Sequence, residues 1–384
     1  MTLSRRTLLA TTLAPAVATL PMARAQAADP VLLAVSGPLT GPNAQYGAQW
    51  KDGFDMALEE FGNKVPGQGG DRPLQYVFED SQSDARQAVA LAQKFVADKR
   101  YCMELGDFAS PASMAASSIY QRAGMVQFGF TNSHPDFTKG GNYMWSTSIS
   151  QADEQPKLAD FAVKGLGGKR VALMHLNTDW GRTSKDLFVP AAKALGGEVV
   201  ATEAFLSDER DFRPTLVRAR DAKPDILVLI AYYGDAALIA RQARDQGLTQ
   251  PILGVSSVYS PKLIELGGPA VEGMYTHSPF SAVDPRPEVQ TFVQRFQKKF
   301  NREPDAFNVY AYDAIVMAHA VIAQFGSDRK AIRDGLEKIK DVPSVIFGKA
   351  SFDPATRRVA EPRYARLVVK NGKFAPWDGV NKAS

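Results

Sequence analysis

Residues 31–42 decide the fold; they read Val-Leu-Leu-Ala-Val-Ser-Gly-Pro-Leu-Thr-Gly-Pro. The opening apolar run is typical of a strand that is buried on both faces of a parallel sheet. A Gly/Pro loop follows it, and the stretch from about Asn43 to Phe61 then predicts a helix. The same alternation continues through strand candidates at 74–79, 101–105 and 125–128, separated by helix candidates at 84–97 and 111–122. This order indicates βαβ units and a mostly parallel sheet.

A second series of the same kind begins near residue 153. Its strand candidates lie at 170–176, 198–204, 226–232 and 252–255, and its helix candidates at 153–164, 182–195, 212–221 and 236–246. Because both series share their lengths and alternation, the sequence predicts an α/β protein with two Rossmann-like lobes. The last third holds only short extended pieces between helices. Such pieces can complete both sheets, so we expect several segments to cross between the lobes as a hinge.

The composition is that of a globular protein and gives no reason to expect nucleic acid as a partner. The chain has 384 residues, of which 45% are apolar and 22% charged, and a formal net charge of +4. Three of its 45 basic residues, Arg5, Arg6 and Arg24, lie in the first 28 residues, which hold no acid. The rest of the chain is therefore nearly neutral and has no general attraction for a polyanion or an anionic membrane.

The N-terminus has the pattern of an export signal. Arg5 and Arg6 precede an apolar run from Leu8 to Leu20, and small residues at 23–27 offer a cleavage site. The run is short and interrupted by Thr and Pro, which argues against a membrane span. The order Ser-Arg-Arg-Thr-Leu-Leu resembles a twin-arginine signal. We therefore expect residues 1–27 to be a signal peptide and the mature protein to be soluble in the periplasm, with no direct membrane anchor.

Patterns that carry catalysis or bind a cofactor are missing. The four histidines lie more than 40 residues apart, and the single cysteine, Cys102, excludes an intrachain disulfide and a four-cysteine zinc site. Residues 254–258 depart from the GxSxG pattern, and residues 165–170 depart from both phosphate-loop patterns. We therefore expect no catalytic residue, no metal and no cofactor.

Hydroxyl-bearing loops follow two strands of the first series. Ser110 stands where the loop after the third strand enters a helix, and Thr131 and Ser133 follow the fourth strand. Ligands of open α/β sheets bind beyond the carboxyl ends of the strands, and hydroxyl groups beside a helix start suit a carboxylate. For Ser110 the sequence is equally compatible with a plain helix cap.

In the second series, Trp180, Tyr232 and Ser256 each follow a different strand. Aromatic side chains opposite hydroxyl-lined loops suit a small solute that has a carboxylate and an apolar body. Each aromatic residue alone is also compatible with ordinary packing, but their recurrence at equivalent loops favours a cleft.

Taken in order, these loops resemble the type I periplasmic solute-binding proteins of ABC transporters, and most of all the leucine/isoleucine/valine-binding proteins. The similarity extends from about residue 30 to 376. It is carried by residues 31–42, Tyr46-Gly47, 80–84, the Ser110 loop, 135–138, 241–244 and 307–314.

The resemblance implies two lobes joined by three crossovers, which we expect near 146–148, 276–278 and 347–352. An N-terminal lobe would then comprise 29–146 plus 278–347. A C-terminal lobe would comprise 148–276 plus 352–376, and 377–384 would form a tail.

The resemblance also implies a ligand site. The ligand carboxylate would bind Ser110, Thr131 and Ser133. The body of the ligand would lie between Tyr46 and Trp180, and Tyr232 would lie beside its ammonium group.

One position departs from the family pattern. Relatives that bind amino acids carry an acid just after the strand that ends at Gly254, where this sequence has Ser256. A buried ammonium without a nearby negative charge is costly. Either Asp107 or Asp179 supplies that charge from another loop, or the ligand is an aromatic, aliphatic or keto acid that lacks the ammonium.

The leading interpretation is the periplasmic substrate-binding component of an ABC importer. It would capture a branched-chain amino acid or a related small hydrophobic or aromatic carboxylate by lobe closure, and deliver it to an inner-membrane ABC permease. A ligand-sensing component for a membrane receptor would have the same fold. An exported enzyme would need a reacting group of residues that the sequence does not offer.

Overall fold

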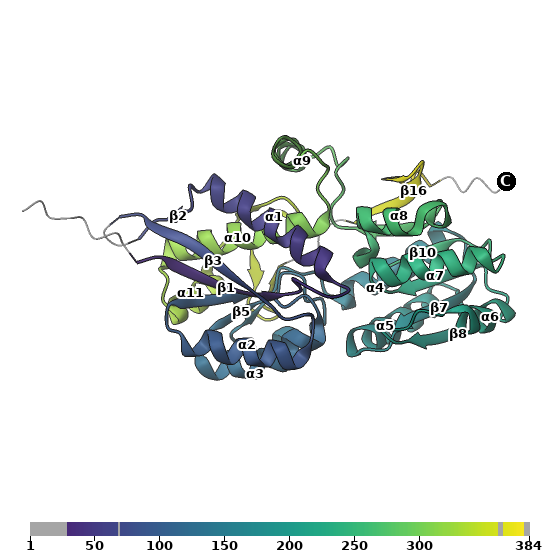
Figure 1. The fold of residues 1–384 in the computed structure, drawn as a ribbon, viewed down its shortest axis with the longest axis horizontal. Helices are drawn as coiled ribbons and strands as arrows, with labels where there is room; N and C mark the ends of the chain where they lie inside the picture. Colours follow the sequence, from purple (N-terminus) through teal and green to yellow (C-terminus); the bar gives the residue numbers. More distant parts are fainter. Residues whose placement is uncertain (1–28, 68–69, 360–363, 380–384) are drawn as a thin grey trace, which may run out of the picture.

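The structure, a computed structural model, describes residues 29–67, 70–359 and 364–379. The expected signal peptide therefore lies outside the described residues. Two lobes lie side by side, each built on a largely parallel sheet (Figure 1). The predicted α/β class with two lobes is confirmed.

The first lobe is built on a six-stranded sheet in the order β2-β3-β1-β4-β5-β6, in which only β2 is antiparallel to its neighbour. Its strands are β1 (Val31–Gly37), β2 (Lys64–Val65), β3 (Arg72–Asp80), β4 (Tyr101–Leu105), β5 (Val126–Phe128) and β6 (Met144–Trp145). Helices α1 and α10 cover one face and α2 and α3 the other (Figure 1). The helices of this lobe are α1 (Ala44–Glu60), α2 (Ala85–Ala97), α3 (Ser110–Ala123), η1 (Phe137–Gly140), α10 (Ala306–Phe325) and α11 (Arg329–Lys338).

The second lobe is built on a seven-stranded sheet in the order β17-β16-β11-β10-β9-β7-β8, parallel from β8 to β11 and antiparallel beyond. Its strands are β7 (Arg170–Leu176), β8 (Glu198–Phe205), β9 (Ile226–Ile230), β10 (Ile252–Gly254), β11 (Tyr275–Ser278), β16 (Ala365–Lys370) and β17 (Lys373–Pro376). Its helices are α4 (Gln151–Asp160), η2 (Phe161–Gly165), α5 (Asp179–Ala194), α6 (Arg213–Asp221), α7 (Tyr233–Asp245), η3 (Ser256–Val258), α8 (Pro261–Gly267) and η4 (Gly268–Val271).

Strand β1 behaves as its sequence predicts, because all seven of its residues are buried between parallel neighbours. Helix α10 is the core helix of the first lobe. It is long and apolar enough to cross a membrane by length and composition, but 78% of its apolar window is buried and it packs on α1. Its start is fixed by a capping box between Asp305 and Asn308.

Helix α5 begins earlier than the expected residue 182. The Thr178 side chain caps it by accepting a hydrogen bond from the Gly181 backbone N–H at 3.2 Å. Trp180 therefore lies in the first helical turn, which fixes the direction of its indole ring.

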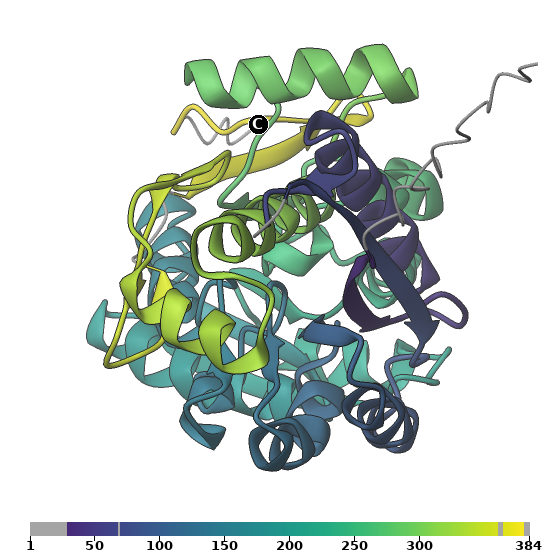
Figure 2. The same ribbon diagram turned by 90° about the vertical axis from the view of Figure 1, so that its left-hand side faces the viewer.

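Three segments join the lobes. The first crossing runs from β6 to α4, and the second runs from β11 to α9 (Pro287–Phe300). Helix α9 lies outside the layers of the first lobe (Figure 2). The described residues on either side of 360–363 are those of β15 (Arg358–Val359) and those of 364–379, which include β16.

The third crossing was expected near 347–352. The chain there forms two short hairpins, β12 (Val342–Ser344) with β13 (Gly348–Ala350) and β14 (Phe352–Asp353) with β15. The Phe352 ring packs on Phe128 and Trp145 of the first lobe, with centroids 6.1 and 5.2 Å away. This apolar contact keeps the segment in the first lobe up to β15.

Candidate functional site

A cavity lies between the lobes, at the carboxyl ends of strands from both sheets. The empty space there, which includes open solvent, is about 560 Å³. Its lining comprises Phe108, Ser110, Thr131, Ser133, Ser148, Ile149, Glu154, Trp180, Tyr232, Ser256, Ser257, Phe307 and Tyr310. Six of the seven residues selected from the sequence are brought together here, and Tyr46 is the exception.

Ser110 and Thr131 offer hydroxyl groups at one part of this lining. Ser110 is the first residue of α3, and Ala109 occupies the N-cap position without a side-chain cap. The alternative in which Ser110 caps its helix is therefore wrong. The Thr131 hydroxyl is buried and finds no hydrogen-bond partner among the described residues. An unpaired buried hydroxyl costs about 1–3 kcal/mol, so a ligand oxygen that pairs with it is stabilised.

Ser133 and Trp180 connect the lobes across the cavity. The Trp180 indole N–H donates to the Ser133 hydroxyl oxygen at 3.0 Å. The indole ring also stacks on Tyr232, with centroids 5.1 Å apart and an angle of 14° between the planes. Trp180 and Tyr232 thus form one continuous aromatic wall, and Ser133 holds its orientation.

Tyr46 lies behind the cavity wall rather than in it. Its ring stacks on Phe108 with centroids 4.2 Å apart, and Phe108 presents the inner surface. The buried Tyr46 hydroxyl donates to the Ser257 carbonyl at 2.9 Å and accepts from the Tyr233 backbone N–H at 3.3 Å. Tyr46 therefore ties α1 to the second lobe, and the sequence pattern did not separate this role from ligand contact.

Neither of the two acids considered as a counter-charge lines the cavity. Asp107 is buried, which raises its pKa to about 6, and it accepts from the Ala109 N–H at 3.4 Å. Asp179 is 53% exposed and lies 3.2 Å from His134 Nε2. Both side chains are outside the lining among the described residues.

Glu154, in the first turn of α4, is the acid that does line the cavity. Its Oε1 accepts from the Ser256 backbone N–H at 2.9 Å and lies 3.1 Å from His277 Nε2. Burial alone would raise the pKa of Glu154, but the bonds from His277 and Ser256 outweigh it and hold that pKa below its usual value. The sequence pattern did not single out Glu154, because this residue lies within helix α4 and not in a loop at the end of a strand.

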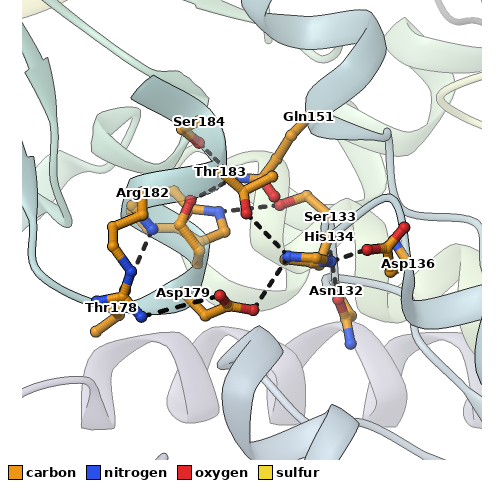
Figure 3. A network of polar contacts seen from close by, with 12 residues as sticks. Asn132, Ser133, His134, Asp136, Gln151, Thr178, Asp179, Arg182, Thr183 and Ser184 are labelled. Carbon is orange, nitrogen blue, oxygen red and sulfur yellow. Dashed lines mark hydrogen bonds and ion pairs between the residues drawn. The ribbon is translucent and has the colours of Figure 1, made fainter. Parts of the chain in front are cut away.

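A polar network runs between the two lobes (Figure 3). On the first lobe, His134 Nδ1 accepts from the Asp136 backbone N–H at 3.1 Å. His134 Nε2 faces α5, 3.1 Å from the Thr183 hydroxyl and 3.2 Å from an Asp179 oxygen. The Gln151 side-chain amide donates to the Trp180 carbonyl at 2.7 Å. The His134 contacts cross from the first lobe to the second and belong to a closed arrangement, whereas the Gln151 contact holds α4 against α5 within the second lobe.

Within the described ranges, no group of three or more His, Cys, Asp or Glu side chains is placed to hold a metal ion. Cys102 is buried.

Comparisons with known proteins agree on the relationship. A family model described as periplasmic binding protein matches residues 30–373. Leu/Ile/Val-binding protein homolog 1 of Brucella suis is 28% identical over 330 residues, which is 84% of this chain and 86% of that protein.

Two solved structures are also similar to this chain. The leucine binding protein LivK from Thermotoga maritima superposes with a TM-score of 0.84 at 27% identity, covering 90% of this chain and 97% of that one. A putative branched-chain amino acid ABC transporter from Rhodospirillum rubrum is 35% identical, with a TM-score of 0.66 and coverage of 90% and 99%.

Proposed function

Because the chain belongs to the periplasmic binding protein family, we propose that it captures a small solute between its lobes and delivers it to an inner-membrane ABC permease. The solute is a branched-chain amino acid or a related small hydrophobic or aromatic carboxylate. The descriptions of similar proteins from T. maritima and B. suis, which name leucine and Leu/Ile/Val, support this class. The export pattern of residues 1–27 supports a periplasmic location.

The unpaired Thr131 hydroxyl is the observation that carries the proposal. Thr131 lines the same cavity as Ser110, the first residue of α3, where backbone N–H groups have no partner within the helix, and its buried hydroxyl is left for a ligand to pair with. A carboxylate bound there would accept from hydroxyl and backbone donors together. The apolar part of the solute would then contact Phe108 and the wall formed by Trp180 and Tyr232.

Two measurements test this function. The purified protein is denatured, and the released small molecule is identified by mass spectrometry. A thermal-shift panel of amino acids and carboxylates then ranks the ligands. We expect small hydrophobic amino acids or carboxylates in the panel to raise the melting temperature of the protein. An unchanged melting temperature with every compound would contradict the proposed function.

Thr131→Val tests the placement of the carboxylate. Losing a charge-assisted hydrogen bond of about 1.5–3 kcal/mol would weaken binding about ten- to a hundredfold. The melting temperature of the free protein should change little, because the hydroxyl has no protein partner to lose. Thr138→Val is the control, since Thr138 is buried in the same lobe outside the cavity. Equal affinity of Thr131→Val and the control, by calorimetry, would reject the placement.

A further inference from the structure

We propose that Glu154 receives the positive end of the solute, so that the site selects zwitterionic 2-amino acids over carboxylates that lack an ammonium group. This inference rests on the proposed capture of a carboxylate solute in the same cavity. It assigns a specificity-determining role to a residue outside the loops that follow the strands.

The charges of the cavity lining favour a zwitterion. Glu154 is the only Asp, Glu, Lys, Arg or His side chain among the described residues that line it. A solute with only a carboxylate would therefore add a second negative charge to a partly enclosed cavity that has no lining cation; His277, which pairs with Glu154, lies outside the lining. Two like charges in a poorly solvated site disfavour each other, whereas an ammonium group would be attracted to Glu154.

Glu154 lies next to Ser256, the position at which the family pattern has an acid. Its Oε1 accepts from the Ser256 backbone N–H at 2.9 Å, so the carboxylate stands directly beside the residue where the family pattern predicts an acid. Helix α4 thus brings a negative charge to the place from which Ser256 removes one. The Ser256 N–H fixes one oxygen of Glu154.

His277 acts on Glu154 from behind. Its Nε2 lies 3.1 Å from Glu154 Oε1, and its ring stacks on Tyr364 with centroids 4.6 Å apart. His277 lines a separate depression with Lys157 and Arg366, while Glu154 lines the interlobe cavity. His277 is therefore a positioning residue, and Glu154 is the group that meets the solute.

Matched ligand pairs test the proposal by isothermal titration calorimetry. Leucine, isoleucine and phenylalanine are each compared with the 2-oxo acid of the same side chain, which replaces the ammonium-bearing carbon by a carbonyl. We expect the wild-type protein to bind the best amino acid at least tenfold more tightly than its oxo acid. Glu154→Gln should weaken amino-acid binding at least tenfold and leave oxo-acid binding equal or tighter.

Two further variants keep this test interpretable. Glu198→Gln is the matched control: it neutralises an acid of the second lobe that is 73% exposed and outside the lining, so it should keep the wild-type preference. Glu154→Asp keeps the charge on a shorter side chain and should still prefer the amino acid, even where Glu154→Gln folds poorly.

The possible outcomes distinguish the role of Glu154 from the proposed capture of a carboxylate solute. A wild-type preference for the oxo acid, or an unchanged preference in Glu154→Gln, would overturn the role of Glu154 and leave the capture of carboxylate solutes in place. Loss of the preference in Glu154→Asp would also overturn it, because the charge is retained. Failure of every pair to bind the wild-type protein would contradict the proposed function and this inference together.

Discussion

His134 shows how one side chain links lobe closure to protonation. Its Nδ1 accepts from the Asp136 N–H, so the proton of the neutral ring is on Nε2, which faces Asp179 and Thr183 of the other lobe. Burial lowers the pKa of His134, and the charge of Asp179 opposes this only in part. If Nδ1 were protonated, its N–H would face the backbone N–H of Asp136, and the hydrogen bond between them would be lost.

Solute affinity should therefore fall on acidification. In an open form the imidazole meets water and has its ordinary pKa of about 6.5, above that of the closed form. The open form then binds protons more readily, so closure is fully favoured above about pH 6.5 and weakens as pH falls below it. We expect a severalfold larger dissociation constant at pH 5.5 than at pH 7.5, and a smaller change in His134→Gln. Isothermal titration calorimetry at both pH values measures the dissociation constants. An identical loss of affinity in the wild-type protein and in His134→Gln would contradict the assignment of this pH dependence to His134.

The sequence predicted many of the residues that line the cavity, but it did not predict what each side chain does there. Ser110, Thr131, Trp180 and Tyr232 follow strands, so local order along the chain predicts their positions. Glu154 becomes part of the site only because a crossing turns α4 toward β10 and β11. Such packing between distant segments leaves no local pattern.

Among the elements, β15 matters for the hinge because Arg358 ties two crossings together. Its buried guanidinium donates to the Ser146 hydroxyl at 3.1 Å, the Ser148 carbonyl at 2.9 Å and the His134 carbonyl at 2.6 Å. Burial lowers the pKa of Arg358 to about 10, which still leaves it charged at neutral pH. The charge is compensated by three oxygen acceptors on the first lobe and the first crossing.

Arg358→Met should destabilise the protein by about 3–5 kcal/mol, because it leaves buried acceptors without a donor. Lys349→Met is the matched control: Lys349 is exposed in the neighbouring β13, and its replacement should stay within about 0.5 kcal/mol. Denaturant unfolding of both variants measures the difference. A loss no larger in Arg358→Met than in the control would show that this guanidinium does not hold the hinge.

The elements themselves follow the sequence closely where burial is continuous. Strand β1 and helix α1 were expected at 31–36 and about 43–61 and lie at Val31–Gly37 and Ala44–Glu60. The two hairpins at 342–359 were not predicted, and the contacts of Phe352 with Phe128 and Trp145 pack them on the first lobe. A short extended piece does not reveal in sequence which sheet it joins.

In the whole molecule, contacts between the two lobes gather around the candidate ligand cavity. Tyr46, Ser133 and His134 of the first lobe each bond to the second lobe, and all three lie beside the lining or in it. A solute that contacts both lobes would stabilise this closed arrangement over an open one, since only the closed arrangement offers it the contacts of both lobes. Capture would then consist of a shift in the population of closed molecules.

Small-angle X-ray scattering of the ligand-free protein and of the protein saturated with its identified solute tests this most directly. Bound and free samples are compared at the same concentration and pH, with Thr131→Val at the same solute concentration as the control for weakened binding. If the lobes close on the solute, the radius of gyration should be smaller in the bound protein. The decrease should be less in Thr131→Val, in proportion to its lower occupancy. An identical radius of gyration for the free and the saturated wild-type protein would contradict capture by lobe closure.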